Sequence, residues 1–105
     1  MADAQATWDH IEQAELRIDG VSPGTGFGRS DGLRIHGKIY AIRNDHDLIL
    51  KLPRDRVVRM IESGTGRPWG PGTGRIMREW IAIPEARSSA WAALTGEARA
   101  FVGSR

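Results

Sequence analysis

The spacing of apolar residues predicts a helix at each end of the chain. Between residues 4 and 19 apolar side chains recur every three or four positions, so they share one helix face, and the other face is acidic. Gly20 ends this helix. The same spacing predicts a last helix from Ser88, its N-cap, to Val102. The two stripes consist of Ala4, Trp8, Ile11, Ala14 or Glu15 and Ile18 in the first helix, and Trp91, Leu94, Ala98, Phe101 and Val102 in the last.

A short helix is predicted in the middle of the chain, from Pro53 to about Ser63. Proline suits the first helical position because the N–H that it lacks has no partner there anyway. Gly64 is the C-terminal stop. The expected buried residues are Val57, Val58 and Ile61, and the expected outward residues are Arg54, Arg56 and Arg59.

Between residues 33 and 52 the apolar period changes to two, which is typical of half-buried strands. Turns are expected at His36-Gly37 and at residues 44–47, where Asn, Asp and Gly favour turn conformations. A further strand is expected before the last helix. The predicted strands span residues 33–36, 38–43, 48–52 and 75–83, and the predicted glycine-rich loops span 21–32 and 64–75.

The parity of the strand residues predicts which face of the sheet is buried. A four-residue turn pairs Arg43 with Leu48, and it aligns the alternate apolar residues of the two flanking strands. For Leu33 to join them, the first turn must be a three-residue bulged turn with Gly37 in the left-handed conformation. The expected core face carries Leu33, Ile39, Ala41, Leu48, Leu50 and Leu52.

The opposite face is then half apolar, with Lys38 on its rim. An aromatic and aliphatic patch rimmed by lysines is typical of a contact surface. We therefore expect this face to bind a second copy of the chain or another protein, unless a terminal segment folds over it. The candidate interface residues are Tyr40, Ile42, Ile49 and Lys51.

Length and composition indicate one domain, residues 1–105, without cysteine chemistry. The chain has 105 residues, 15 basic and 13 acidic side chains and no cysteine. No charge-free stretch is long enough for a membrane span or a signal peptide, so we expect a cytoplasmic protein that does not bind membranes.

The charge is divided unevenly along the chain. Residues 1–32 hold two basic and six acidic side chains, whereas residues 33–105 hold 13 basic and seven acidic ones. A basic stretch of this kind is typical of a nucleic-acid face, although it also occurs as ordinary solvated surface. The candidate nucleic-acid ligands are Arg54, Arg56, Arg59, Arg67, Arg75 and Arg78.

The residues that carry enzyme chemistry are not grouped in the sequence. The tetrapeptide Gly-Thr-Gly-Arg occurs twice. A phosphate-binding P-loop requires a Lys and then a Ser or Thr after its last glycine, and neither copy is followed by them. His36 and His46 fall in different turns, so no metal site is expected. Glu79 alternates with apolar residues, and we expect it to form a structural ion pair rather than to act in catalysis. No catalytic residue and no cofactor are predicted.

Several short motifs, taken in order, resemble the N-terminal domain of the TfoX/Sxy family and, more distantly, the YjbR/MmcQ group. They are Gly26-Phe27-Gly28, Gly32-Leu33, Gly37-Lys38-Ile39-Tyr40-Ala41, Leu50-Lys51-Leu52-Pro53, Pro68-Trp69 and Met77-Arg78-Glu79-Trp80. The family-motif positions that we single out are Phe27, Gly28, Gly37, Lys38, Lys51, Pro53, Met77, Glu79 and Trp80.

This resemblance implies a two-layer α+β domain with an antiparallel sheet of about five strands, in the order α-β-β-β-α-β-β-α. It also implies a bacterial regulatory role and no known catalytic residues. We therefore expect a regulatory or protein-interaction domain whose outer sheet face binds a second copy of the chain or another protein. The alternative is a nucleic-acid-binding regulator that uses the arginines, and the third possibility is a ligand-binding protein or enzyme near Glu79.

Overall fold

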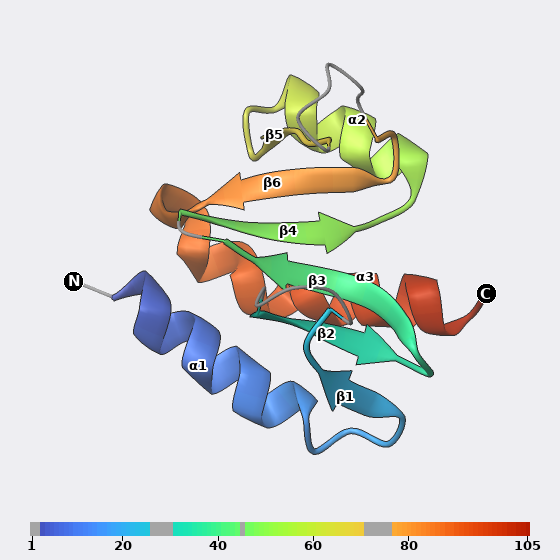
Figure 1. Ribbon diagram of the computed structural model, residues 1–105. Helices are drawn as coiled ribbons and strands as arrows, with labels where there is room; N and C mark the ends of the chain where they lie inside the picture. Colours follow the sequence, from blue (N-terminus) through green and yellow to red (C-terminus); the bar gives the residue numbers. More distant parts are fainter. Residues whose placement is uncertain (1–2, 26–30, 45, 71–76) are drawn as a thin grey trace.

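The computed structural model describes residues 3–25, 31–44, 46–70 and 77–105, and it has an α+β fold (Figure 1). Its sheet is antiparallel, with six strands in the spatial order β1-β2-β3-β4-β6-β5. The predicted fold class is confirmed, but β1 and β5 lie in segments that were predicted as loops, and β6 begins at Trp80, later than the predicted residue 75. The elements are α1 (Ala4–Glu15), β1 (Val21–Pro23), β2 (Asp31–Ile35), β3 (Lys38–Arg43), β4 (Asp47–Lys51), α2 (Arg54–Glu62), β5 (Arg67–Pro68), β6 (Trp80–Pro84), the 3-10 helix η1 (Glu85–Ala90) and α3 (Trp91–Gly103).

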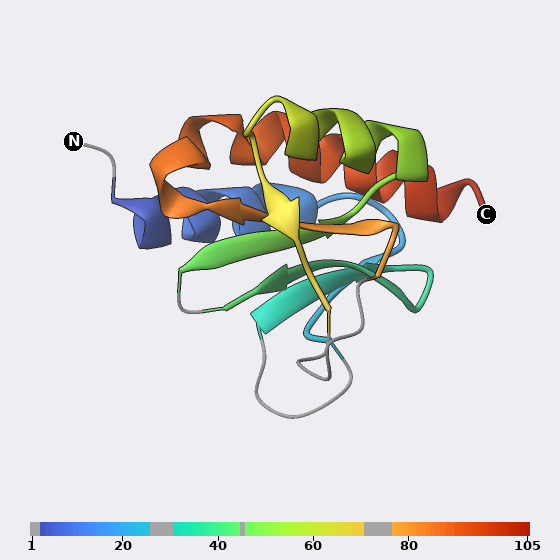
Figure 2. The same cartoon turned by 90° about the horizontal axis from the view of Figure 1, so that it is seen from above.

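The three α-helices cover one face of the sheet, which gives the domain two layers (Figure 2). Apolar residues from that face and from all three helices form the main core. Within the described ranges, none of the helices combines the length and the apolar character that spanning a bilayer requires. The largest fully buried apolar residues of the main core are Trp8, Leu33, Tyr40, Leu48, Leu50, Leu52, Ile81, Ile83 and Trp91.

Two helix boundaries differ from the prediction. Asp3 caps α1, and its side chain accepts a hydrogen bond of 3.0 Å from the backbone N–H of Gln5. This helix ends at Glu15, earlier than the predicted residue 19. The last α-helix begins at Trp91, because the tighter η1 occupies residues 85–90, so the predicted cap at Ser88 is wrong.

The middle helix begins at Arg54, with Pro53 as its N-cap instead of the predicted first helical residue, and its buried face is narrower than expected. Val57 and Met60 are buried, and Ile61 is half-buried. Val58 is 46% exposed, so the prediction that it is buried is wrong. Successive helical residues lie about 100° apart around the axis, so Val57 and Val58 do not point into the same core.

A bulge in β3 changes the predicted assignment of side chains to the two faces. Arg34 pairs with Ile39 and Leu33 pairs with Ala41, which leaves Tyr40 as an extra residue in β3. Tyr40 and Ala41 both belong to the main core, and Ile39 lies against a cluster on the other face. The predictions of an inward Ile39 and an outward Tyr40 are therefore wrong.

The turn before β3 contains two residues instead of the predicted three. His36 has a φ of 52° and Gly37 a φ of 82°, and two positive φ values are typical of a type I′ turn. Ile35 accordingly pairs with Lys38. The positive φ at Gly37 is as predicted. The bulge at Tyr40, and not the turn, changes which residues of β3 face the core.

The outer face of the sheet is covered by other parts of the same chain. Ile42 and Ile49 are 7% and 1% exposed, so the expectation that they form an exposed patch is wrong. Trp69 and Met77 pack over this region, so the cover comes from the predicted glycine-rich loop and the segment after it and not from a terminal segment. The outer cluster consists of buried Ile42, Ile49, Trp80 and Ala82 with half-buried Ile39, Trp69 and Met77.

Candidate functional site

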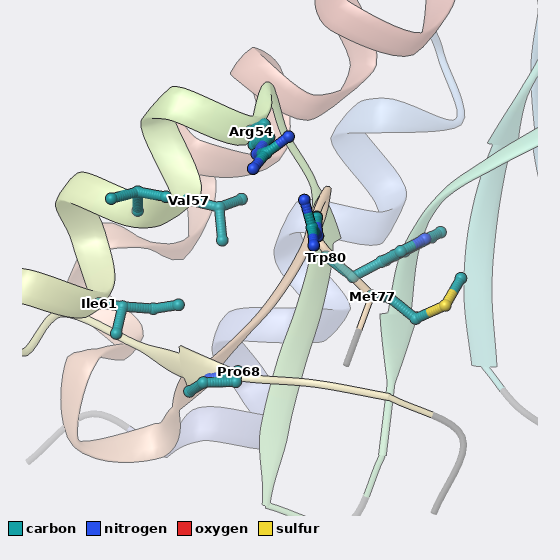
Figure 3. A pocket seen from close by; sticks show the side chains of 8 residues that line it. Arg54, Val57, Ile61, Pro68, Met77 and Trp80 are labelled. Carbon is teal, nitrogen blue, oxygen red and sulfur yellow. The ribbon is translucent and has the colours of Figure 1, made fainter. Parts of the chain in front are cut away.

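A pocket of about 210 Å³ opens between α2 and the edge of the sheet. Figure 3 shows Val57 and Ile61 pointing from α2 into the space that Pro68, Met77 and Trp80 border on the other side. These lining groups are aliphatic, aromatic or thioether side chains. The pocket therefore has an apolar interior that is suited to an apolar side chain.

The pocket exists because β5 is short. Its last residue, Pro68, pairs with Ile81, so β5 does not run alongside Trp80 at the start of β6. The chain returns to β6 beside the pocket, where the Met77 N–H donates a 3.0 Å hydrogen bond to the Trp69 carbonyl oxygen. This hydrogen bond holds Trp69 and Met77 together at one side of the pocket.

Two arginines line this pocket together with the apolar side chains. Arg54 comes from the first turn of α2, and Arg78 comes from the turn before β6. Both are exposed, and neither forms an ion pair with any residue that the structure describes. Val58, the most exposed large apolar residue among those described, also lines the pocket. An apolar group with a nearby anion would therefore complement the lining of this pocket.

A second hollow, of about 520 Å³, lies on the other side of Trp80 and is basic. The Lys51 ammonium stands 5.7 Å from the centre of the Trp80 ring, a cation–π distance. Lys38 Nζ donates a 3.0 Å hydrogen bond to the Arg105 carbonyl oxygen. Arg105 in turn pairs with Glu79 at 3.0 Å. We call this the Lys38–Lys51 hollow, and the first one the α2 pocket.

The six candidate arginines do not form one free basic surface in the described part of the chain. Arg56 pairs with Glu97 at 3.1 Å, and Arg67 pairs with Asp47. Among these six, the exposed arginines without an ion pair to a described residue are Arg54, Arg59 and Arg78. Arg75 lies outside the described residues.

The family-motif positions are divided among several parts of the molecule. Glu79 is partly exposed and forms its ion pair with Arg105, as expected of a structural carboxylate. The positions that line one or both hollows are Gly37, Lys38, Lys51, Met77 and Trp80. Pro53 precedes α2, and Phe27 and Gly28 lie outside the described residues.

A buried polar cluster links the first helix, the sheet and the last helix. The Tyr40 hydroxyl donates a 2.8 Å hydrogen bond to Glu15 Oε1, and Arg99 Nε donates a 3.0 Å hydrogen bond to the same oxygen. Burial, and then the hydrogen bond to Glu15, raise the pKa of Tyr40 well above its ordinary value. Neither hollow includes these residues, so we assign this cluster to the stability of the fold.

A second polar cluster lies at the other end of β3. The buried Arg43 guanidinium pairs with Glu85 at 3.0 Å, donates to the Asn44 carbonyl oxygen at 2.8 Å, and stands 4.9 Å from the centre of the Trp91 ring. These contacts join β3 to η1 and α3. Glu12 of α1 is half-buried, and this burial, followed by the negative charges of Asp31 and Asp9, raises the pKa of its carboxyl group.

The described residues include no group of three His, Asp or Glu side chains arranged to hold a metal ion. Comparisons with protein-family models, with curated proteins and with solved structures found no significant match to this chain.

Two of the pocket residues, Val58 and Pro68, were not recognisable as such from the sequence. Val58 was assigned to the core, although its position directly after Val57 is a sign that one of the two faces solvent. Pro68 was assigned to a loop because a two-residue strand leaves no period in the sequence. Arg54 and Arg78 were both chosen as candidate residues, but their sequence separation hid that they line one pocket.

Proposed function

We propose that this protein is a regulatory protein-interaction module that binds an apolar side chain of a partner protein in the α2 pocket. The observation that carries this proposal is the apolar lining beside Arg54 and Arg78, two exposed arginines without an ion pair to a described residue. The protein would exert the regulatory role that the resemblance to the TfoX/Sxy family implies by binding a partner, and not by catalysis. We place this activity in the cytoplasm.

The volume of the α2 pocket favours a side chain over a whole small molecule. Ligand pockets usually measure roughly 300–1,000 Å³. The α2 pocket measures about 210 Å³, which is enough for one or two apolar side chains. Such a side chain would act as the buried anchor of a larger contact.

Selection of binders from a random-peptide display library tests this proposal. We expect the retained peptides to carry an apolar anchor residue, and we expect Val58→Glu to abolish their binding, because it places a carboxylate at the mouth of the pocket. Leu16→Glu is the matched control, since Leu16 is the other exposed large apolar residue among those described and lies at the C-cap of α1, away from the pocket lining. Fluorescence anisotropy of a selected peptide measures both effects.

The proposal predicts a clear difference between these two variants. A peptide that binds wild type and Leu16→Glu equally well, but not Val58→Glu, supports it. If no peptide is selected, or if both variants bind like wild type, then the α2 pocket is not an interaction site. Circular dichroism of each variant checks that the fold is retained.

The second candidate function is nucleic-acid binding, which the exposed Arg54, Arg59 and Arg78 favour. Binding of this kind depends on phosphate contacts and weakens steeply as salt rises. Titration of a DNA duplex at about 50 mM and about 200 mM salt tests it. We expect little binding at the lower salt, and tight, salt-dependent binding would favour this candidate over the peptide module.

A further inference from the structure

We infer that the partner segment is acidic and extended, and that it crosses Trp80 from the α2 pocket to the Lys38–Lys51 hollow. This inference rests on the proposed function and adds the chemistry of the partner to it. The apolar anchor would lie in the α2 pocket, and carboxylates would lie near the basic residues on both sides of Trp80.

Charge complementarity is the first argument for an acidic partner. The two hollows are bordered by five basic residues, Arg54, Arg78, Lys38, Lys51 and Arg105, and one acid, Glu79, is paired beside them. The remaining residues of the chain hold ten basic and twelve acidic side chains. The positive charge of the whole protein therefore arises at these hollows. A patch of one sign attracts and orients a partner of the opposite sign.

The second argument is that Trp80 lines both hollows. Lys51 of β4 is its register partner, and Ile39 of the next strand, β3, lines the far hollow. Neighbouring strands lie about 5 Å apart, so the path from β6 to β3 is about 10 Å long. About three residues of extended chain, at about 3.3 Å each, cover that distance. One short segment can therefore contact both hollows.

The lining of the hollows favours a peptide over a nucleic acid. Single-stranded nucleic acids bind through bases that stack on exposed aromatic faces. Trp80 is only 9% exposed, Lys51 stands over its ring, and Trp69 packs against it at 5.6 Å with the two planes tilted by 55°. Val57 and Ile61 in the α2 pocket suit an aliphatic side chain, which a nucleic acid lacks.

Labelled synthetic peptides of about ten residues, each with a central leucine, test the inference by fluorescence anisotropy. The first probe has glutamates on both sides of the leucine, the second has glutamines instead, and the third has glutamates on one side only. We expect the two-sided acidic probe to bind at least about tenfold tighter than the glutamine probe, a difference of about 1.4 kcal/mol. The one-sided probe should bind with intermediate affinity, because it can fill only one of the basic ends.

Two charge-reversal variants, one at each hollow, test the position of the segment. Arg78→Glu and Lys38→Glu should each weaken the two-sided acidic probe by about tenfold and should hardly change the glutamine probe. Arg87→Glu is the matched control, because Arg87 is exposed on η1 and lines neither hollow. Raising the salt concentration should reduce the advantage of the acidic probe, since exposed charges are screened.

The possible results separate this inference from the proposed function. If the glutamine and acidic probes bind equally well through Val58, the interaction module stands and the acidic partner is overturned. If Lys38→Glu has no more effect than Arg87→Glu, the segment does not cross Trp80. Failure of every leucine probe, together with an unsuccessful display selection, overturns both. Tighter binding of a labelled oligothymidylate than of the acidic probe overturns the choice of a peptide partner.

Discussion

Tyr40 is fully buried although it lies in a strand between Ile39 and Ala41, where simple alternation would place it on the opposite face from both. Its hydroxyl needs a partner in the core, and Glu15 of α1 supplies the acceptor. Glu15 also pairs with Arg99 of α3, so its negative charge is compensated. The Glu15 carboxylate therefore joins α1 to β3 and α3.

Tyr40 should ionise only when the protein unfolds. Its folded pKa lies above its unfolded value of about 10, so its contribution to stability is complete below that pH and is lost as the pH rises further. Because Tyr40 is the only tyrosine, tyrosinate absorbance reports on it alone. We expect this absorbance to appear together with the loss of the circular dichroism signal in an alkaline titration. Tyrosinate formation near pH 10 in a folded chain would contradict the buried hydrogen bond. The Tyr40→Phe variant, which has no tyrosine, is the control for absorbance changes from other groups.

At the scale of elements, the hairpin between β2 and β3 shows what the sequence could and could not predict. Gly37 after a histidine, between two apolar strands, was enough to predict a turn with a positive φ. The bulge at Tyr40 was not predictable, because either face of a half-apolar strand can be inward. The choice is made by contacts with Glu15 and Arg99, which are distant in sequence.

Two glycine substitutions should change stability in opposite directions. Gly37→Ala should destabilise the protein by about 1–2 kcal/mol, because a side chain at a φ of 82° is strained. Gly96→Ala should stabilise it by about 0.5–1 kcal/mol, because Gly96 lies inside α3 and an added Cβ meets only the end of Arg99, at 3.7 Å. Urea unfolding measures both changes. Equal effects of the two substitutions would be inconsistent with the two backbone conformations described.

At the scale of the whole molecule, the outer sheet face is covered by the chain itself. We therefore expect wild-type protein to sediment as a single species of 11.6 kDa at all accessible concentrations. Trp69→Ala should uncover Ile42 and Ile49, lower the free energy of unfolding by about 1–3 kcal/mol, and promote self-association. A wild-type dimer, left intact by Trp69→Ala, would show that self-association uses another surface.

The helices were easier to predict than the candidate site for a physical reason. Each helix face is encoded by residues within a few turns of each other, as Trp8 and Ile11 or Trp91 and Leu94 illustrate. The α2 pocket instead forms where a helix, a two-residue strand and the start of β6 meet. The charged residues of the pocket could be recognised in the sequence, but the walls of the pocket come together only in the folded chain.

Both outer strands of the sheet are short and end in proline. β1 has three residues and ends at Pro23, and β5 has two and ends at Pro68. A proline cannot donate a backbone hydrogen bond to an added strand, and short edges offer few groups to pair. Both edges of the sheet therefore hinder edge-to-edge pairing with another copy of the chain. Such pairing is the route by which open sheets grow into fibrils.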